Sequence, residues 1–147
     1  MAEIDHTIEI SRPPEEVFAR LNDVTRWSEW QDDVLSARIE GDGPIEVGTK
    51  VTQTRRLGRR ELTTTTEVTE YNPPRSYAFR GVGGPIRPIA RCTVEPVDGA
   101  RSRVTFELGF EGHGPGKLVL PFVRRQARKT LASQHERLKE QMESGSG

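Results

Sequence analysis

Two histidines lie on the apolar sides of predicted elements, where side chains are expected to face the interior of the protein. His135 lies four residues after Leu131 and three before Leu138, on the apolar stripe of a long predicted helix, and His6 shares the apolar side of the first predicted strand. Because the pKa of free histidine is about 6.5, either ring could act as a general acid or base near neutral pH. The alternative interpretation, a buried core histidine without a chemical role, stays open for both.

Polar residues form a second group, on the expected inner face of two neighbouring strands. The alternating residues are Val51, Gln53, Arg55 and Leu57 on one strand and Leu62, Thr64, Thr66 and Val68 on the next. A guanidinium without partners is costly to bury. Arg55 therefore marks either the polar end of a pocket or, after a one-residue shift in register, the exposed face of the sheet.

Four arginines surround a predicted hairpin turn in the run Arg55-Arg56-Leu57-Gly58-Arg59-Arg60. They could bind an acidic partner or a phosphate, although a solvated hairpin tip needs no partner. No aromatic residue lies among them as a stacking platform for single-stranded nucleic acid. The whole chain carries 22 Lys and Arg against 22 Asp and Glu, a net charge of zero, so we expect no nucleic-acid partner.

The sequence lacks the motifs of several enzyme classes. It contains no Gly-x-Ser-x-Gly, His-Glu-x-x-His or Cys-x-x-Cys pattern, and the Gly41-Asp-Gly43 turn lacks the third glycine of a dinucleotide-binding loop. The single cysteine, Cys92, excludes an internal disulfide and a cysteine zinc cluster. We therefore expect no metal ion and no cofactor.

Length and composition fit one ordinary globular domain. With 147 residues, of which 33% are hydrophobic, the chain can bury a core without metal ions or disulfides. We expect a single domain over residues 1–143 and a flexible tail at 144–147. The N-terminus has no signal-peptide pattern and no apolar run reaches the length of a membrane span. A cytoplasmic location without stable membrane insertion is the expectation that follows.

The hydrophobic periodicity predicts the elements that must position these side chains. Alternation predicts a first strand over 4–10, prolines and acidic residues then begin a short helix over 13–22, and a second short turn covers 25–30. Six further strands are expected at 34–40, 47–57, 59–71, 75–82, 87–95 and 101–110, and a long helix at 117–142. The connections between these strands are too short for parallel crossovers, so the sheet should be antiparallel.

This order of elements resembles the START-like (SRPBCC) superfamily, and within it the polyketide cyclase/dehydrase group. The resemblance is carried by Trp27 and Trp30 after the first helix, the Val-Gly-Thr-Lys-Val segment at 47–51, the Glu-Val-Thr-Glu-Tyr-Asn-Pro-Pro run at 67–74 and the closing long helix. It implies the α+β helix-grip fold of Bet v 1-like proteins. In that fold a curved, seven-stranded antiparallel sheet wraps around a long C-terminal helix, with two short helices between strands 1 and 2.

The resemblance also implies a cavity between sheet and helix that binds a hydrophobic or aromatic small molecule, such as a polyketide or lipid. If the protein is an enzyme, the implied reaction is cyclisation or dehydration of a ketone-bearing chain. In that case Tyr77, His6 or His135 would move protons and Arg55 would stabilise enolate charge. The alternatives are a non-catalytic lipid or quinone carrier or sensor, and a partner-binding, chaperone-associated protein.

We expect ligand contacts from side chains on the inner faces of the strands and helices. The expected ligand-binding residues are Trp30, Gln53, Thr66, Phe79, Cys92, Phe106, Phe110 and Leu131. The alternation that places them inside also suits plain core residues, since large side chains normally fill protein interiors. A monomer or a homodimer is expected.

Overall fold

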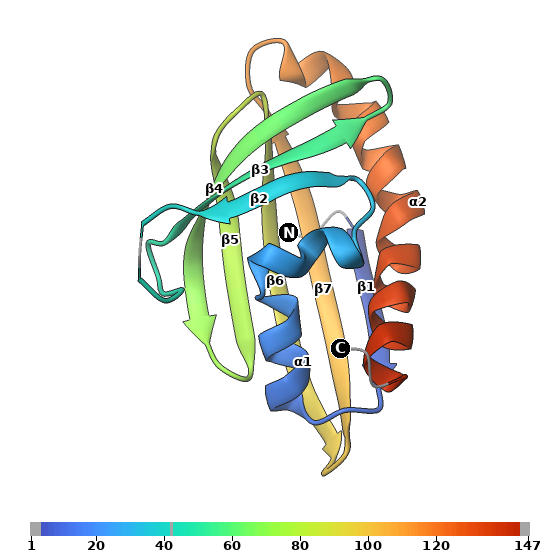
Figure 1. The fold of residues 1–147 in the computed structure, drawn as a ribbon. Helices are drawn as coiled ribbons and strands as arrows, with labels where there is room; N and C mark the ends of the chain where they lie inside the picture. Colours follow the sequence, from blue (N-terminus) through green and yellow to red (C-terminus); the bar gives the residue numbers. More distant parts are fainter. Residues whose placement is uncertain (1–3, 42, 145–147) are drawn as a thin grey trace.

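The elements of the protein follow the predicted order in a computed structural model that describes residues 4–41 and 43–144. They are β1 (Ile4–Ile10), α1 (Pro14–Leu21), the short helix η1 (Val24–Glu29), β2 (Val34–Ile39), β3 (Lys50–Leu57), β4 (Arg60–Asn72), β5 (Ser76–Gly83), β6 (Ile86–Asp98), β7 (Arg101–Gly112) and α2 (Gly116–Glu143) (Figure 1). The prediction of two short helices between the first two strands is confirmed.

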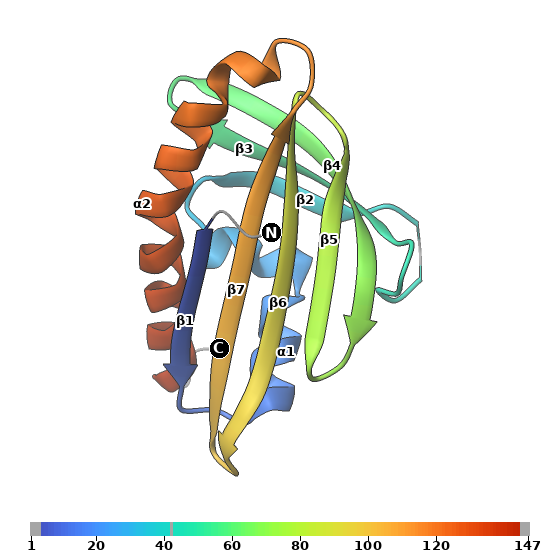
Figure 2. The same cartoon turned by 180° about the vertical axis from the view of Figure 1, so that it is seen from behind.

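All seven strands form one antiparallel sheet in the order β1-β7-β6-β5-β4-β3-β2. Strands that follow one another from β2 to β7 are joined as neighbours, and β1 closes the far edge by pairing with β7. The sheet curls, and α2 lies across its concave side, packed against β1, β7 and β6 (Figures 1 and 2). This arrangement confirms the predicted helix-grip fold.

The long helix α2 turns its predicted apolar stripe toward the sheet. Leu131, Leu138 and Met142 of that stripe are buried, while Leu120 and Ala127 are half-buried. Pro121 lies in the second turn of the helix. The first turns of α2 run at an angle to the rest of the helix (Figures 1 and 2), as a proline inside a helix causes.

The packed core occupies one end of the molecule. There α1 covers the sheet, and its Val17, Phe18 and Leu21 pack with Ile10, Val94, Val104 and Leu138 at or below 3% exposure. The β1, β6 and α2 segments that supply these residues converge at the same end (Figure 1). At the opposite end the curved sheet diverges from α2, and side chains do not fill the space between them.

No helix among residues 4–41 and 43–144 is long and apolar enough to cross a membrane. The tail expected at 144–147 lies outside the described residues except for Ser144. The Ser144 hydroxyl donates to the carbonyl oxygen of Gln141 at 3.0 Å, at the end of α2.

Candidate ligand-binding site

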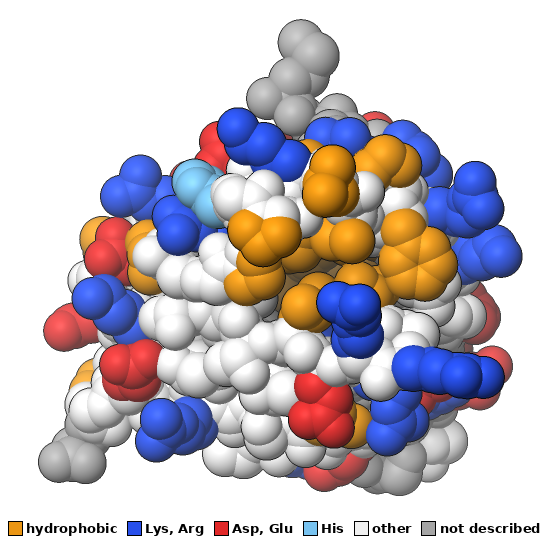
Figure 3. Space-filling model, turned by 90° about the horizontal axis from the view of Figure 1, so that it is seen from above, with side chains coloured by type: hydrophobic (Ala, Val, Ile, Leu, Met, Phe, Trp, Pro, Cys, Tyr) orange, Lys and Arg blue, Asp and Glu red, His pale blue; other side chains and the backbone are white. Residues whose placement is uncertain are grey.

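The space between α2 and the concave face of the sheet is a cavity of about 170 Å³. Six aromatic side chains line it: Trp27, Trp30, Tyr77, Phe79, Phe106 and Phe110. Around its opening, hydrophobic side chains surround a hollow in the end of the molecule (Figure 3). A mostly apolar cavity with a few polar groups is typical of a site for a small organic molecule.

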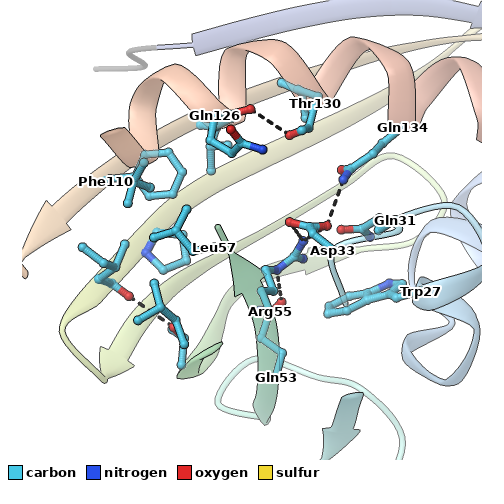
Figure 4. Close-up of a pocket in the computed structure, with 18 of the residues that line it drawn as sticks. Trp27, Gln31, Asp33, Gln53, Arg55, Leu57, Phe110, Gln126, Thr130 and Gln134 are labelled. Atoms are coloured by element: carbon cyan, nitrogen blue, oxygen red, sulfur yellow. Dashed lines mark hydrogen bonds and ion pairs between the residues drawn. The ribbon is translucent and has the colours of Figure 1, made fainter. Parts of the chain in front are cut away.

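The polar groups of the cavity converge on one carboxylate, Asp33. The Arg55 Nη1 donates to Asp33 Oδ1 at 3.2 Å and to Oδ2 at 3.4 Å, and the Gln134 Nε2 donates to Oδ1 at 2.9 Å. The Arg55 Nε donates to Gln53 Oε1 at 2.7 Å. Figure 4 shows these four side chains pointing toward one another from β3, from the residue just before β2 and from α2. We call Asp33, Gln53, Arg55 and Gln134 the polar cluster.

Register explains why Arg55 and Asp33 meet. Strands β3 and β4 pair Gln53 with Thr64 and Arg55 with Leu62, as expected for residues that share the inner face. The Arg56 backbone N–H donates to the carbonyl oxygen of Asp33 at 2.8 Å, which fixes Asp33 beside β3 just before β2 begins. Arg55 therefore lies in the cavity wall and not on the exposed face of the sheet.

Arg55 has donors that the protein does not use. Burial lowers the pKa of its guanidinium, and the charge and hydrogen bonds of Asp33 partly offset this effect. The side chain is 33% exposed, and among the described residues no acceptor contacts its Nη2 group. A ligand oxygen in the cavity can therefore bind Nη2 without breaking the contact between Arg55 and Asp33.

The two histidines meet. The Nδ1 atoms of His6 and His135 lie 2.9 Å apart, so one ring donates to the other. His135 is 3% exposed and lies against the rings of Trp30 and Phe106. Burial, and then the charge of His6, lower the pKa of His135 to about 3. The His135 ring lines the cavity and is neutral at physiological pH, whereas His6 is outside the lining.

Tyr77 and Cys92 form a buried pair across β5 and β6. Burial, with Cys92 as its neighbour, raises the pKa of Tyr77 well above its usual value. Burial also raises the pKa of the Cys92 thiol to about 12. Both groups stay protonated at neutral pH. Tyr77 is part of the cavity wall, but the Cys92 side chain lies behind that wall, in the core.

The structure brings most of the expected ligand-binding residues into one cavity wall. Those in the lining are Trp30, Gln53, Phe79, Phe106, Phe110 and Leu131, together with Tyr77, His135 and Arg55. Thr66, Cys92 and His6 are outside it. The Thr66 hydroxyl, 3% exposed, donates to the Val51 carbonyl oxygen at 3.4 Å, and Thr64 lies in the wall in its place. Thr66 lies farther along β4, where Val51 and Val68 are also buried.

Sequence reasoning missed Asp33 and Gln134. Gln134 lies three residues after Leu131 and four before Leu138, so the helical period already placed it on the inner face. Asp33 had no such signal, because it precedes β2 and takes part in no alternation. Among the described residues, no group of three or more His, Cys, Asp or Glu side chains could hold a metal ion.

Comparison with known proteins gives a family match and a set of similar folds. The model of a family described as polyketide cyclase/dehydrase and lipid transport matches residues 1–143. The TTHA0849 protein of Thermus thermophilus is 19% identical, with a TM-score of 0.79, over 98% of this chain and 99% of that one. No curated protein matches the chain at a significant level.

Two further solved structures share the fold. The Zhui aromatase/cyclase of a Streptomyces species is 14% identical over 94% of this chain and 91% of its own, with a TM-score of 0.76. A START superfamily protein of Mycobacterium smegmatis is 15% identical over 95% and 97%, with a TM-score of 0.76. At these identities the likeness is one of fold, and with the family match it supports a hydrophobic ligand-binding fold.

Proposed function

Because the chain belongs to the polyketide cyclase/dehydrase and lipid transport family, we propose that its cavity binds a mainly apolar, ring-bearing small molecule with one oxygen-bearing polar end. The observation that carries this proposal is the unused Nη2 group of Arg55 in a wall that contains six aromatic side chains. A carbonyl, phenolate or carboxylate oxygen would accept from Nη2, and the apolar body of the ligand would lie toward Leu57 and Phe110 (Figure 4).

A second donor supports an oxygen-bearing ligand. The Trp30 side chain is 5% exposed and lines the cavity, and among the described residues its indole N–H has no acceptor. A buried donor without an acceptor is costly, and a ligand oxygen that reached this N–H would remove that cost. Trp30 and Arg55 would thus select for oxygen atoms, while the phenylalanine rings select for flat apolar groups.

Binding without turnover is the activity that the protonation states favour. A histidine with a pKa of about 3 is a weak base near pH 7, and raised pKa values make the Tyr77 phenol and the Cys92 thiol weak acids. Hence His135, Tyr77 and Cys92 are residue types that often transfer protons, but burial makes each of them a poor proton donor or acceptor near pH 7. We therefore place a carrier or sensor function ahead of an enzymatic one.

The test uses two fluorescent probes that differ in one charged group. Anilinonaphthalene sulfonate and N-phenyl-1-naphthylamine share an aromatic body, and only the first carries an oxyanion. The two tryptophans of the chain both line the cavity, so energy transfer from them reports binding of either probe. Arg55→Gln should weaken sulfonate binding about 10-fold or more, as expected for the loss of a charge-assisted hydrogen bond, and leave the neutral probe unaffected.

Two controls separate the site from the rest of the molecule. Arg75→Gln removes an exposed positive charge in the turn between β4 and β5, and both probes should bind as before. Ala127→Phe places a ring into the cavity from α2 and should block both probes, whereas Ala132→Phe on the exposed side of the helix should block neither. Equal weakening of both probes by Arg55→Gln would contradict a polar end at Arg55.

Cyclisation is a second candidate, favoured by the presence of Asp33 beside Arg55. Among the described residues that line the cavity, Asp33 is the only carboxylate. In this scheme Asp33 takes a proton from a methylene between two ketones, the resulting carbanion attacks a third ketone carbon, and the alkoxide oxygen takes that proton back from Asp33. Asp33 then removes the second proton of the former methylene, and the new hydroxyl group leaves with it as water. Arg55 would stabilise the enolate. A poly-β-ketone analogue that loses water only in the presence of the wild-type chain, and not with Asp33→Asn, would support this activity.

A further inference from the structure

An exposed apolar tip lies at the start of α2, beside the opening of the cavity. Leu118 is 85% exposed, Phe122 is 46% exposed and Val119 is 36% exposed. A Cβ atom at Gly58 would lie 3.9 Å from the Phe122 Cζ, so this ring sits next to the turn between β3 and β4. Figure 3 shows the hydrophobic side chains of this end gathered around the hollow. Exposed apolar side chains in such a group mark a contact surface.

Positive charges surround this apolar tip, and several of them have no ion-pair partner in the part of the chain that the structure describes. The segment 112–135 contains five Lys and Arg side chains and no Asp or Glu. Six cations at this end make no ion pair with any described carboxylate. They are Lys117, Arg125, Arg128 and Lys129 on α2 and Arg59 and Arg60 on the hairpin between β3 and β4. Figure 3 shows Lys and Arg side chains around the hydrophobic group.

Part of this charge lines a shallow groove on α2. Arg124, Arg125, Arg128 and Lys129 surround it together with Pro121. The net charge of the chain is zero, so the concentration of cations at this end is local and not a property of the whole protein. We call Leu118, Val119 and Phe122, with Lys117, Arg125, Lys129, Arg59 and Arg60, the mouth surface.

We infer that the mouth surface docks on a membrane that contains anionic phospholipid, with the cavity opening facing the bilayer. The apolar tip reaches the boundary between headgroups and acyl chains, and the surrounding cations contact the phosphates. This combination fits a lipid surface better than an acidic protein, because Leu118 extends almost wholly into solvent and needs an apolar medium rather than a charged one. Docking in this orientation would let an apolar ligand pass between cavity and bilayer without crossing water.

The test measures co-sedimentation of the full chain with lipid vesicles. Vesicles of phosphatidylcholine with phosphatidylglycerol should bind the protein, and vesicles of phosphatidylcholine alone should not. Higher salt should weaken binding. The double variant Arg59→Gln/Arg60→Gln should lose about 10-fold or more, since each cation near an anionic surface contributes roughly a factor of five.

Three matched variants complete the design. Leu118→Ser/Phe122→Ser removes the apolar tip and should also lose about 10-fold or more in binding. Arg38→Gln/Arg75→Gln removes two exposed cations away from the mouth, neither of which pairs with a described carboxylate, and should bind normally. Ala127→Phe should bind vesicles as the wild type does, which separates docking from ligand binding in the cavity. All of these changes except Ala127→Phe are on exposed side chains, and a thermal melt checks folding.

The results of these experiments distinguish an anionic bilayer from an acidic macromolecule as the partner of the mouth surface. Loss of binding in both the arginine and the Leu118/Phe122 variants supports membrane docking. If the arginine variant fails but Leu118→Ser/Phe122→Ser binds normally, the surface acts through charge alone, and docking on a bilayer is overturned in favour of an acidic macromolecule. Absence of binding to anionic vesicles, or equal binding to neutral ones, would also overturn the inference.

Discussion

The Nδ1 atoms of His6 and His135, 129 residues apart in sequence, lie 2.9 Å from each other and join the edge strand β1 to the C-terminal half of α2. This contact fastens the helix to the strand that closes the sheet. It also places an imidazole in a wall of aromatic rings, where a charge is costly. Protonation of His135 is therefore expected to lower the stability of the fold.

Acid should destabilise the protein through His135. Its pKa is about 3 in the folded state and about 6.5 in the unfolded chain, so between these values only the unfolded state takes up the proton. The free energy of unfolding should be independent of this group above pH 7 and fall by about 2 kcal/mol from pH 7 to pH 5. Urea denaturation of the wild type and of His135→Gln should show a weaker pH dependence in the variant. Parallel curves would show that His135 carries no such shift.

The carboxylate of Asp33 should affect stability and anion binding in opposite directions. Asp33→Asn keeps the shape of the side chain but removes the charge that faces Arg55 and accepts from Gln134. We expect a loss of about 1 to 2 kcal/mol in urea denaturation, because the contact is partly exposed. Binding of anilinonaphthalene sulfonate should become tighter, since Arg55 is then free of its competing anion. Weaker binding would instead mean that Asp33 itself contacts the probe.

The two tryptophans should respond differently to replacement by phenylalanine. The Trp27 Nε1 donates to the Leu21 carbonyl oxygen at 2.9 Å, and the Trp30 Nε1 has no acceptor among the described residues. Trp27→Phe should cost about 1 kcal/mol more than Trp30→Phe in the free energy of unfolding, because only the former removes a hydrogen bond. Equal costs in the ligand-free protein would show that Trp30 also has a partner. In the presence of a tightly bound oxygen-bearing ligand, the difference should shrink.

Cys92 should be inert in the folded protein. Its side chain is fully buried, and burial raises the pKa of its thiol to about 12, so almost no thiolate exists to react. Ellman's reagent should label the single cysteine only in urea. As a positive control, Ile89→Cys in a Cys92→Ser background places a thiol on the exposed face of the same strand, where it should react at once. Rapid labelling of native Cys92 would show that the cavity extends to the sulfur.

Alternation and helical period account for most of what the sequence predicted correctly. The inward positions of β3 and β4 followed from one repeating pattern, so Gln53 and Arg55 could be placed on one face before the register was known. The same argument applies to His6 and His135, whose faces were predicted separately. Their contact was not predictable, because it depends on how far the curl of the sheet brings β1 under α2.

The alternation of side chains along a strand does not predict whether an inward residue lies at the packed end or at the cavity end of the sheet. Thr66 and Cys92 are on the inner face as expected, but they lie toward the packed end, while the cavity begins farther along their strands. Whether an inward side chain lies in the core or in the cavity wall depends on where the helix separates from the sheet. The point at which the helix separates from the sheet depends on the curvature of the whole sheet and not on any local sequence pattern.

The division of the molecule into a packed end and a hollow end has a consequence for evolution. Val17, Val94 and Leu138 belong to the buried core cluster and are outside the cavity lining, whereas lining residues such as Arg55, Phe110 and Ala127 are outside that cluster. Mutations can therefore reshape the hollow end while the packed end keeps the chain above its stability threshold. A scaffold built in this way can acquire new ligands in small steps without losing its fold, and that fold is shared by solved structures at 14% to 19% identity.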